Sequence, residues 1–177
     1  LKGGRVELMP GIYVLAYAPG PSYSLEITGG DVLARGVMFY NTGADYDPIT
    51  GWPDANVTTG QKTTLGRIRL DATMAFSALD TDAFLYPDAP PSIRAFNGLL
   101  IYQRRDNDAN VQFHGFGVDS NFRGTVYAPS ASAWLPARGT FDSQFIVGSM
   151  RIPGHGNVAV EFDDGSAARA PLVFLVE

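Results

Sequence analysis

Short apolar runs of four or five residues recur along the chain, and each follows or begins at a small residue. The runs begin at residues 11, 36, 98, 124 and 143, so the steps between them are 25, 62, 26 and 19 residues. Three steps have similar lengths, and the longest fits two such lengths with an insertion. This recurrence predicts a structural unit of roughly 20–26 residues that is repeated along the chain.

Segments with alternating polar and apolar residues lie between these runs. Alternation with a period of two is typical of a strand that buries one face. Glycine pairs or Gly-x-Gly triplets occur between strands, where tight corners require a positive φ. The alternating segments are residues 24–28, 66–70, 110–114, 132–135, 149–152 and 157–162.

Short strands, glycine corners and a repeated unit together predict an all-β fold. We expect a right-handed parallel β-helix, a solenoid of about six coils that bury their apolar faces by stacking. A β-sandwich is the alternative, because short strands at regular spacing also fit that architecture. The prediction is a single solenoid domain over residues 1–177, with two polar loop insertions at about residues 41–61 and 80–91.

The composition favours strands and turns over helices. The 177 residues include 14 Asp but 4 Glu, and 11 Arg but 2 Lys, whereas Glu and Lys are the residues that favour helix surfaces. The absence of Cys excludes a disulfide scaffold, a Cys nucleophile and an iron–sulfur cluster. A net charge of −5 argues against nucleic acid as a partner. No apolar stretch is long enough to predict a membrane span in this chain.

Paired carboxylates are the strongest candidates for catalysis, because many β-helical proteins cleave polysaccharides with converging acidic side chains. Each pair falls in a predicted turn, however, where Asp commonly caps the backbone. His114 and His155 both lie beside glycines at predicted corners and read as turn residues. We therefore predict no catalytic residue and no enzymatic activity. The acidic pairs are Asp45 with Asp47, Asp80 with Asp82, Asp106 with Asp108 (next to Arg104 and Arg105), and Asp163 with Asp164.

The first polar loop could hold a calcium ion. Asp45, Asp47 and Asp54 place oxygen ligands at intervals along residues 41–61, although a full calcium-loop signature is missing. These three residues are the predicted metal ligands, and no other cofactor is expected.

Aromatic residues fall into two groups. Those on the apolar runs are expected to form stacking ladders inside the fold, and they include Tyr13, Phe39, Tyr40, Tyr102, Phe122 and Tyr127. Trp52, Tyr46 and Tyr86 instead lie in the polar loops. Aromatic side chains among Gly, Pro and Asp suggest a binding surface for sugar or for a protein partner.

The end of the chain is a candidate assembly segment. An unpaired strand at the end of a sheet recruits another chain unless it is capped. The apolar run near the C-terminus follows a polar turn, and we expect it either to cap the fold or to dock on a neighbouring subunit. Its residues are Leu172, Val173, Phe174, Leu175 and Val176.

Several motifs in order resemble one known family. They are MPGIYV at residues 9–14, GGDVLARGVMFYN at 29–41, GLLIYQRRD at 98–106, FRGTVYAP at 122–129 and MRIPGHGNVAV at 150–160. Together they resemble the β-helical C-terminal domain of bacterial TadE/TadG-like proteins, which are associated with assembly of the Flp (tight-adherence) pilus. The resemblance implies an envelope-associated domain without catalytic residues.

These observations predict a non-enzymatic structural or adhesive module of a bacterial cell-surface or pilus-related assembly. The expected partners are other copies of the chain or other envelope and pilus proteins, with glycans as a further ligand class, at an extracellular or cell-surface location. The alternative function is a carbohydrate-active β-helix enzyme or a sugar-binding module that acts on polysaccharide.

Overall fold

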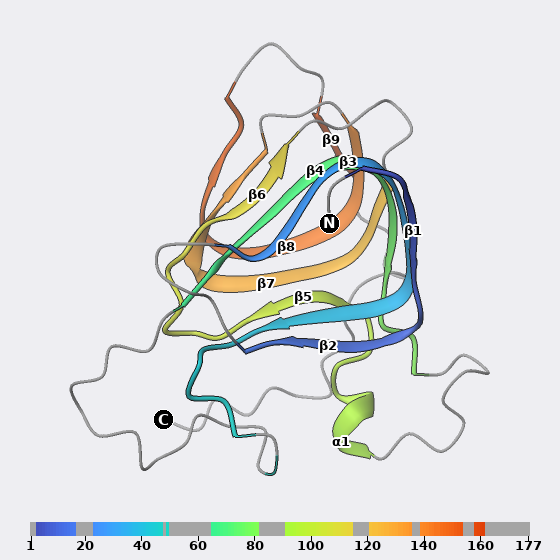
Figure 1. Cartoon of the computed structure of the whole chain (residues 1–177). Coiled ribbons are helices and arrows are strands. Elements are labelled where there is room, and N and C mark those ends of the chain that lie inside the picture. The colour runs from blue at the N-terminus through green and yellow to red at the C-terminus, as the bar shows by residue number, and fades with distance from the viewer. Residues whose placement is uncertain are drawn as a thin grey trace.

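The computed structural model describes residues 3–16, 23–47, 49, 65–81, 91–114, 121–135, 139–153 and 158–161. Within these ranges the chain forms a nine-stranded sheet and one helical turn (Figure 1). The strands are β1 (Arg5–Leu8), β2 (Gly11–Leu15), β3 (Tyr23–Asn41), β4 (Arg67–Ala78), β5 (Leu99–Gln103), β6 (Val111–His114), β7 (Asn121–Trp134), β8 (Gly139–Arg151) and β9 (Val158–Glu161), and the helical turn is α1 (Pro91–Arg94).

Five parallel strands close into a barrel. β3 pairs with β4, β4 with β6, β6 with β7, β7 with β5, and β5 again with β3. The remaining strands extend this ring: β1 and β2 each pair with β3, β8 pairs with β7, and β9 pairs with β8. All of these pairings are parallel.

The predicted β-helix solenoid is therefore wrong, and so is the β-sandwich alternative. The apolar run at residues 36–40 and the alternating segment at 24–28 were read as separate strands, but both belong to the long strand β3. β3 pairs with β4 from Tyr23 to Val37 and with β5 only at Phe39 to Asn41, and the paired strands close a ring. A sandwich would need two sheets, whereas one nine-stranded sheet contains every described strand.

A glycine pair forms a bulge within the part of β3 that pairs with β4. Gly29 and Gly30 have φ values of 71° and 83°, and the register of β3 against β4 shifts between Thr28 and Asp31. A Cβ atom on Gly30 would lie 2.2 Å from the carbonyl oxygen of Gly4, so no side chain fits at that position. The glycine pair predicted as a corner thus lies inside a continuous, bulged strand.

The core consists of side chains that point into the ring. Ile27, Leu70 and Phe113 lie opposite one another on β3, β4 and β6, and each is 1% exposed or less. Phenylalanines fill the centre, where the rings of Phe76, Phe113 and Phe141 all lie within 5.6 Å of a neighbouring phenylalanine ring. The stacking predicted for Tyr13 and Phe39 is confirmed, with 5.8 Å between their ring centroids.

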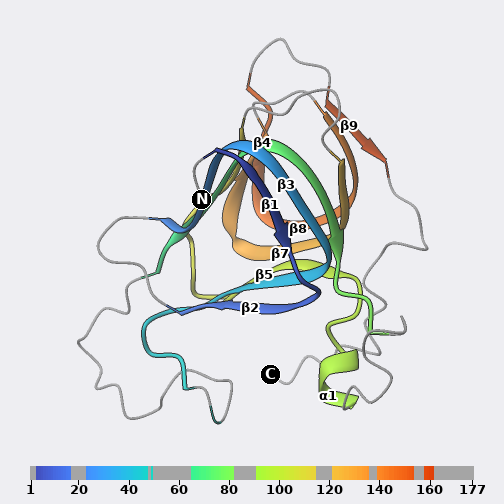
Figure 2. The same ribbon diagram turned by 45° about the vertical axis from the view of Figure 1, so that its right-hand side comes forward.

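A smaller apolar layer covers the outside of one wall. Met38 and Leu99 point outward from β3 and β5 and pack with Ile93 of α1 and with Phe96. Figures 1 and 2 both show α1 beside the wall that contains β2 and β5. This four-residue turn is the only helix among the described residues, and none there is long and apolar enough to cross a membrane.

We expect Phe122→Ala to destabilise the protein by about 3–5 kcal/mol, because the side chain is 1% exposed and packs against the rings of Phe76, Phe113 and Phe141. Urea unfolding followed by circular dichroism measures this change. Phe122→Leu, which keeps most of the volume, should cost clearly less. Equal losses for the two variants would contradict the packing described here.

Candidate functional site

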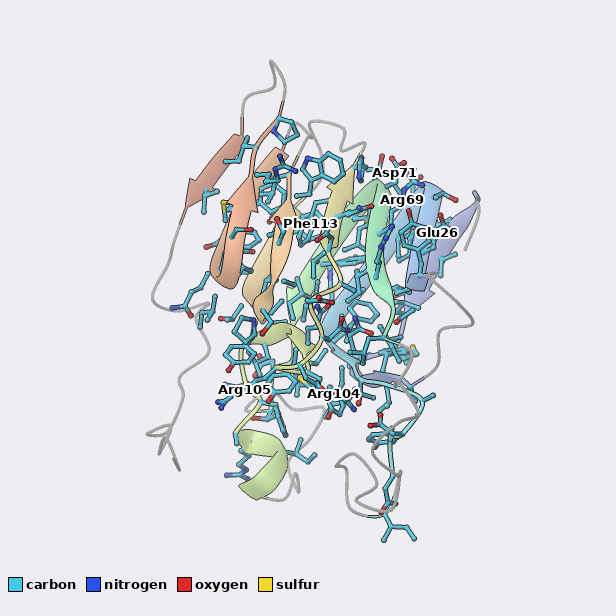
Figure 3. The ribbon with its side chains drawn as sticks, turned by 90° about the vertical axis from the view of Figure 1, so that its left-hand side faces the viewer. Glu26, Arg69, Asp71, Arg104, Arg105 and Phe113 are labelled. Atoms are coloured by element: carbon cyan, nitrogen blue, oxygen red, sulfur yellow. The ribbon has the colours of Figure 1, made fainter. Side chains whose placement is uncertain are left out.

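Two clusters of charged and aromatic side chains lie on the outside of the barrel, at separate places on one side of it (Figure 3). The first surrounds Arg104, directly after β5. The second surrounds Arg69 on β4. They are called the Arg104 cluster and the Arg69 cluster below.

Arg104 joins two loops that are far apart in the sequence. Its Nη1 atom lies 2.6 Å from Oδ1 of Asp45, which follows β3, and its Nη2 atom donates to Oδ2 of Asp106 at 2.7 Å. The backbone amide of Arg104 also donates to the carbonyl of Asn41 at 3.0 Å. The Arg104 and Asp45 side chains are only 11% and 10% exposed, whereas that of Asp106 is 62% exposed.

Burial and hydrogen bonding have opposite effects on the pKa of Arg104. Burial, the largest influence, acts to lower the pKa of the guanidinium, but the hydrogen bonds to Asp106 and Asp45 outweigh it and raise the pKa. Arg104 therefore stays charged, because its hydrogen bonds to the two carboxylates compensate for the cost of burying the charge. Arg104 and Asp45 act as a clamp between the ends of β3 and β5.

Buried amides support this clamp from inside the barrel. Nδ2 of Asn41 donates to Oε1 of Gln103 at 2.9 Å, and Nε2 of Gln103 donates to the carbonyls of Asn107 and Ala109 at 3.0 and 2.7 Å. The side chains of Asn41, Gln103 and Asn107 are fully buried. Buried polar groups are costly unless they are hydrogen-bonded, so this network fixes the loop that carries Arg104.

A row of tyrosines lies beside the Arg104 cluster on the outer face. Tyr40, Tyr102 and Tyr127 are directly opposite one another on β3, β5 and β7, with ring centroids 5.5 and 5.1 Å apart. Burial is the main reason that the pKa of the central Tyr102 is raised. These rings do contact one another, but they form an outer row and not the internal ladder that was predicted. Tyr102 and Tyr127 stack with 8° between their ring planes, whereas Tyr40 meets Tyr102 edge-to-face at 61°.

The structure brings together some of the residues proposed from the sequence. Tyr46 contacts the ring of Tyr40 at 6.0 Å, and Asp45 meets Arg104 and, through it, Asp106. Oδ1 of Asp47 accepts a hydrogen bond from the amide of Ile49 at 2.8 Å. Among the described residues, no three His, Asp or Glu side chains gather in a way that could hold a metal ion.

The other predicted site residues lie outside the described ranges. They are Trp52 and Tyr86 of the binding prediction, Asp54 of the calcium prediction, and the assembly segment Leu172, Val173, Phe174, Leu175 and Val176.

The Arg69 cluster was not predicted. Nη2 of Arg69 donates to Oδ2 of Asp71 at 3.0 Å, Nη1 lies 3.5 Å from Oε1 of Glu26, and the guanidinium lies 5.9 Å from the ring centroid of Tyr23. The hydrogen bond to Asp71 is the main cause that raises the pKa of Arg69. The side chains of Arg69, Asp71 and Glu26 are each about one-third exposed, whereas that of Arg104 is 11% exposed. Figure 3 shows them together on neighbouring strands.

His114 borders this cluster at the end of β6. Its ring lies 5.6 Å from that of Trp134 on β7 in an edge-to-face arrangement. Burial, followed by the positive charge of Arg69, lowers the pKa of His114, and the opposing effect of Asp71 is smaller. The imidazole is therefore neutral at pH 7.

Polar positions in two alternating segments could have indicated part of this cluster. Glu26 occupies an outward position of residues 24–28, and Arg69 does so in residues 66–70. Alternation assigns each to the outer face, but it does not give the register that places Glu26 opposite Arg69.

Comparisons of the chain with protein-family models, with curated proteins and with solved structures gave no significant match. The resemblance to TadE/TadG-like proteins therefore stays a prediction from the sequence.

We expect Arg104→Met to destabilise the protein by about 3 kcal/mol or more, because it leaves the buried carboxylate of Asp45 without its cation. Asp106→Asn is the matched control: its side chain is 62% exposed, and its ion pair should contribute less than about 1 kcal/mol. Chemical unfolding of both variants tests the clamp. Similar losses for the two would show that Asp45 does not depend on Arg104.

His114 should make the protein less stable in mild acid. Its folded-state pKa lies below the unfolded value, so the folded state binds fewer protons, and this contribution to stability is lost as the pH falls below about 6.5. Unfolding of wild type and His114→Asn at pH 7.5 and pH 5 measures the effect. We expect a smaller loss in the variant, with His155→Asn as the comparison at the second histidine. An unchanged loss in His114→Asn would contradict the assignment.

Proposed function

We propose that the protein is a non-enzymatic structural or adhesive module of a bacterial surface assembly, in which copies join end to end. The observation that supports this proposal is the position of the exposed large apolar side chains. Of seven such residues in the described ranges, six lie on or next to strands at the two ends of the sheet, and Ile49 is the exception. They are Met9 and Val14 at one end, and Ile146, Met150, Ile152 and Val160 at the other.

Among the described strands, each end of the sheet has an edge without a partner strand. At the N-terminal end, β1 and β2 pair only with β3 among the described strands, and at the C-terminal end β9 pairs only with β8. Figure 3 shows the strands in series, with these two ends on opposite sides. An open strand edge presents amide and carbonyl groups to another chain.

The register favours pairing between β9 of one copy and β1 of the next. Both strands have four residues. Within one copy, Leu8, Ala34, Phe76, Phe122, Phe141 and Val160 follow one another from β1 to β9 along a single row of paired residues. Parallel addition of a second copy would set its Leu8 beside Val160, which is 47% exposed, and would continue that row.

Joining of unlike ends also determines the form of the assembly. Contacts between unlike ends do not close on themselves and produce a filament.

The segment 172–176 is the proposed second part of the joint. It begins 11 residues after the end of β9 and has the same length, five residues, as the open strand β2. We assign it to the β2 edge of the neighbouring copy, next to Val14. Other envelope or pilus proteins with a similar apolar segment are the alternative occupants of that edge.

An enzymatic function has less support. A glycosidase needs one carboxylic acid and one carboxylate placed on either side of a bond. Asp45 and Asp106 do converge, but both bind the same guanidinium, which holds them as two halves of an ion-pair network.

Lysine at either end should prevent assembly. We expect Val14→Lys and Val160→Lys each to weaken self-association about tenfold or more, because the joint would have to bury an unpaired charge. Ile49→Lys is the matched control, since Ile49 is 92% exposed and lies on none of the strands. Light scattering after size exclusion, over a range of concentrations, and negative-stain microscopy report the result. A wild-type chain that stays monomeric throughout would overturn the proposal.

Mixing the two lysine variants tests the polarity of the joint. Val14→Lys retains an unmodified C-terminal end and Val160→Lys an unmodified N-terminal end, so an equal mixture should form dimers and nothing longer. A mixture that stays monomeric would contradict head-to-tail joining.

Deletion of residues 172–176 should abolish assembly while the barrel stays folded, and continued polymerisation would exclude that segment from the joint.

A further inference from the structure

A single row of planar side chains crosses five strands on the outside of the barrel. The register places Glu26, Arg69, Gln112, Trp134 and Arg151 opposite one another on β3, β4, β6, β7 and β8. Neighbouring strands are about 4.8 Å apart, so the four intervals span about 19 Å. This row is called the outer polar row below.

From this row we infer a binding site for an uncharged saccharide chain that lies across the strands. The inference goes beyond the proposed assembly and does not depend on it, because the row lies on a wall of the barrel rather than at its open edges. It extends the adhesive part of the proposed function by naming a site and a ligand class.

The chemistry of the row fits sugar hydroxyls. Arg69 and Arg151 only donate hydrogen bonds and Glu26 only accepts them, while Gln112 between them is buried, at 7% exposed. A sugar ring carries hydroxyls at its edge and C–H groups on its faces, and Trp134 supplies a partly exposed aromatic surface with its own N–H donor. The neutral His114 beside Trp134 adds one donor and one acceptor.

The ion pairs of the row select against an anionic ligand. The guanidinium of Arg69 already contacts the carboxylates of Asp71 and Glu26. An acidic polysaccharide would bring a third carboxylate to the same guanidinium, whereas a neutral one meets hydrogen-bonding groups without that electrostatic cost.

The site is also held in place before a ligand arrives. Arg69 is fixed between Asp71 and Glu26, with its guanidinium over the ring of Tyr23. Inward neighbours anchor the backbone beneath the row: Ile27, Leu70 and Phe113 are 1% exposed or less. Pre-ordered side chains lose less conformational freedom on binding.

Tryptophan fluorescence tests this inference directly, because the chain has two tryptophans. In Trp52→Phe, Trp134 is the only tryptophan that reports binding. We expect its emission to change in a saturable way with at least one of three neutral hexasaccharides, namely the hexamers of cellulose, starch amylose and chitin. Hexagalacturonate, the acidic comparator, should bind about tenfold more weakly or not at all.

Variants locate the site by calorimetry with the same sugars. Trp134→Ala and Arg69→Met should each weaken binding about tenfold or more. Arg123→Met is the matched control: Arg123 forms a comparable exposed ion pair with Asp142 at 3.1 Å, away from the outer polar row. Val14→Lys should bind like wild type, which separates this site from assembly. No binding to any neutral hexamer, a preference for hexagalacturonate, or full binding by Trp134→Ala would each overturn the inference.

Discussion

Parallel pairing of every described strand is the constraint on which the rest of this structure depends. Parallel strands hold residues of equal position opposite one another, so each position generates a row that crosses several strands. The inward row that contains Phe76, Phe122 and Phe141 fills the barrel, and the outward row of Tyr40, Tyr102 and Tyr127 covers one wall. Because the ring closes through β3–β5 and β5–β7, these rows surround one interior instead of lying on a flat sheet.

Much of the local structure could be predicted from the sequence. Each predicted strand overlaps an observed one, and the rings expected to meet on neighbouring strands do contact one another. Closure could not be predicted, because alternation assigns a residue to a face but says nothing about its partner. The same limit applies to the sites: Asp45 and Arg104 were separate candidates, and only the β3–β5 pairing brings them within 2.6 Å. Continuity through Gly29 and Gly30 was also missed, since glycine marks bulges as well as strand ends.

The two arginine clusters show how burial separates a structural ion pair from a recognition site. Arg104 and Asp45 are almost enclosed, and the amides of Asn41 and Gln103 fix the chain around them. Such a pair holds two loops together and leaves no group free to meet a ligand. The guanidinium of Arg69 has similar partners but is about one-third exposed, so its carboxylate neighbours orient it while a face remains accessible.

The edges of the sheet and the outer polar row lie at different places on the barrel. Assembly as proposed uses the ends of the sheet, whereas the saccharide site lies along a wall, so neither blocks the other. Head-to-tail joining would repeat the outer polar row once in every copy, so weak sites would recur along a filament. Linked sites raise the effective concentration of each site for a long chain, so affinities that are modest per copy become strong in the assembly. A barrel whose sheet has an edge strand at each end and a polar outer wall suits the proposed adhesion through many weak contacts.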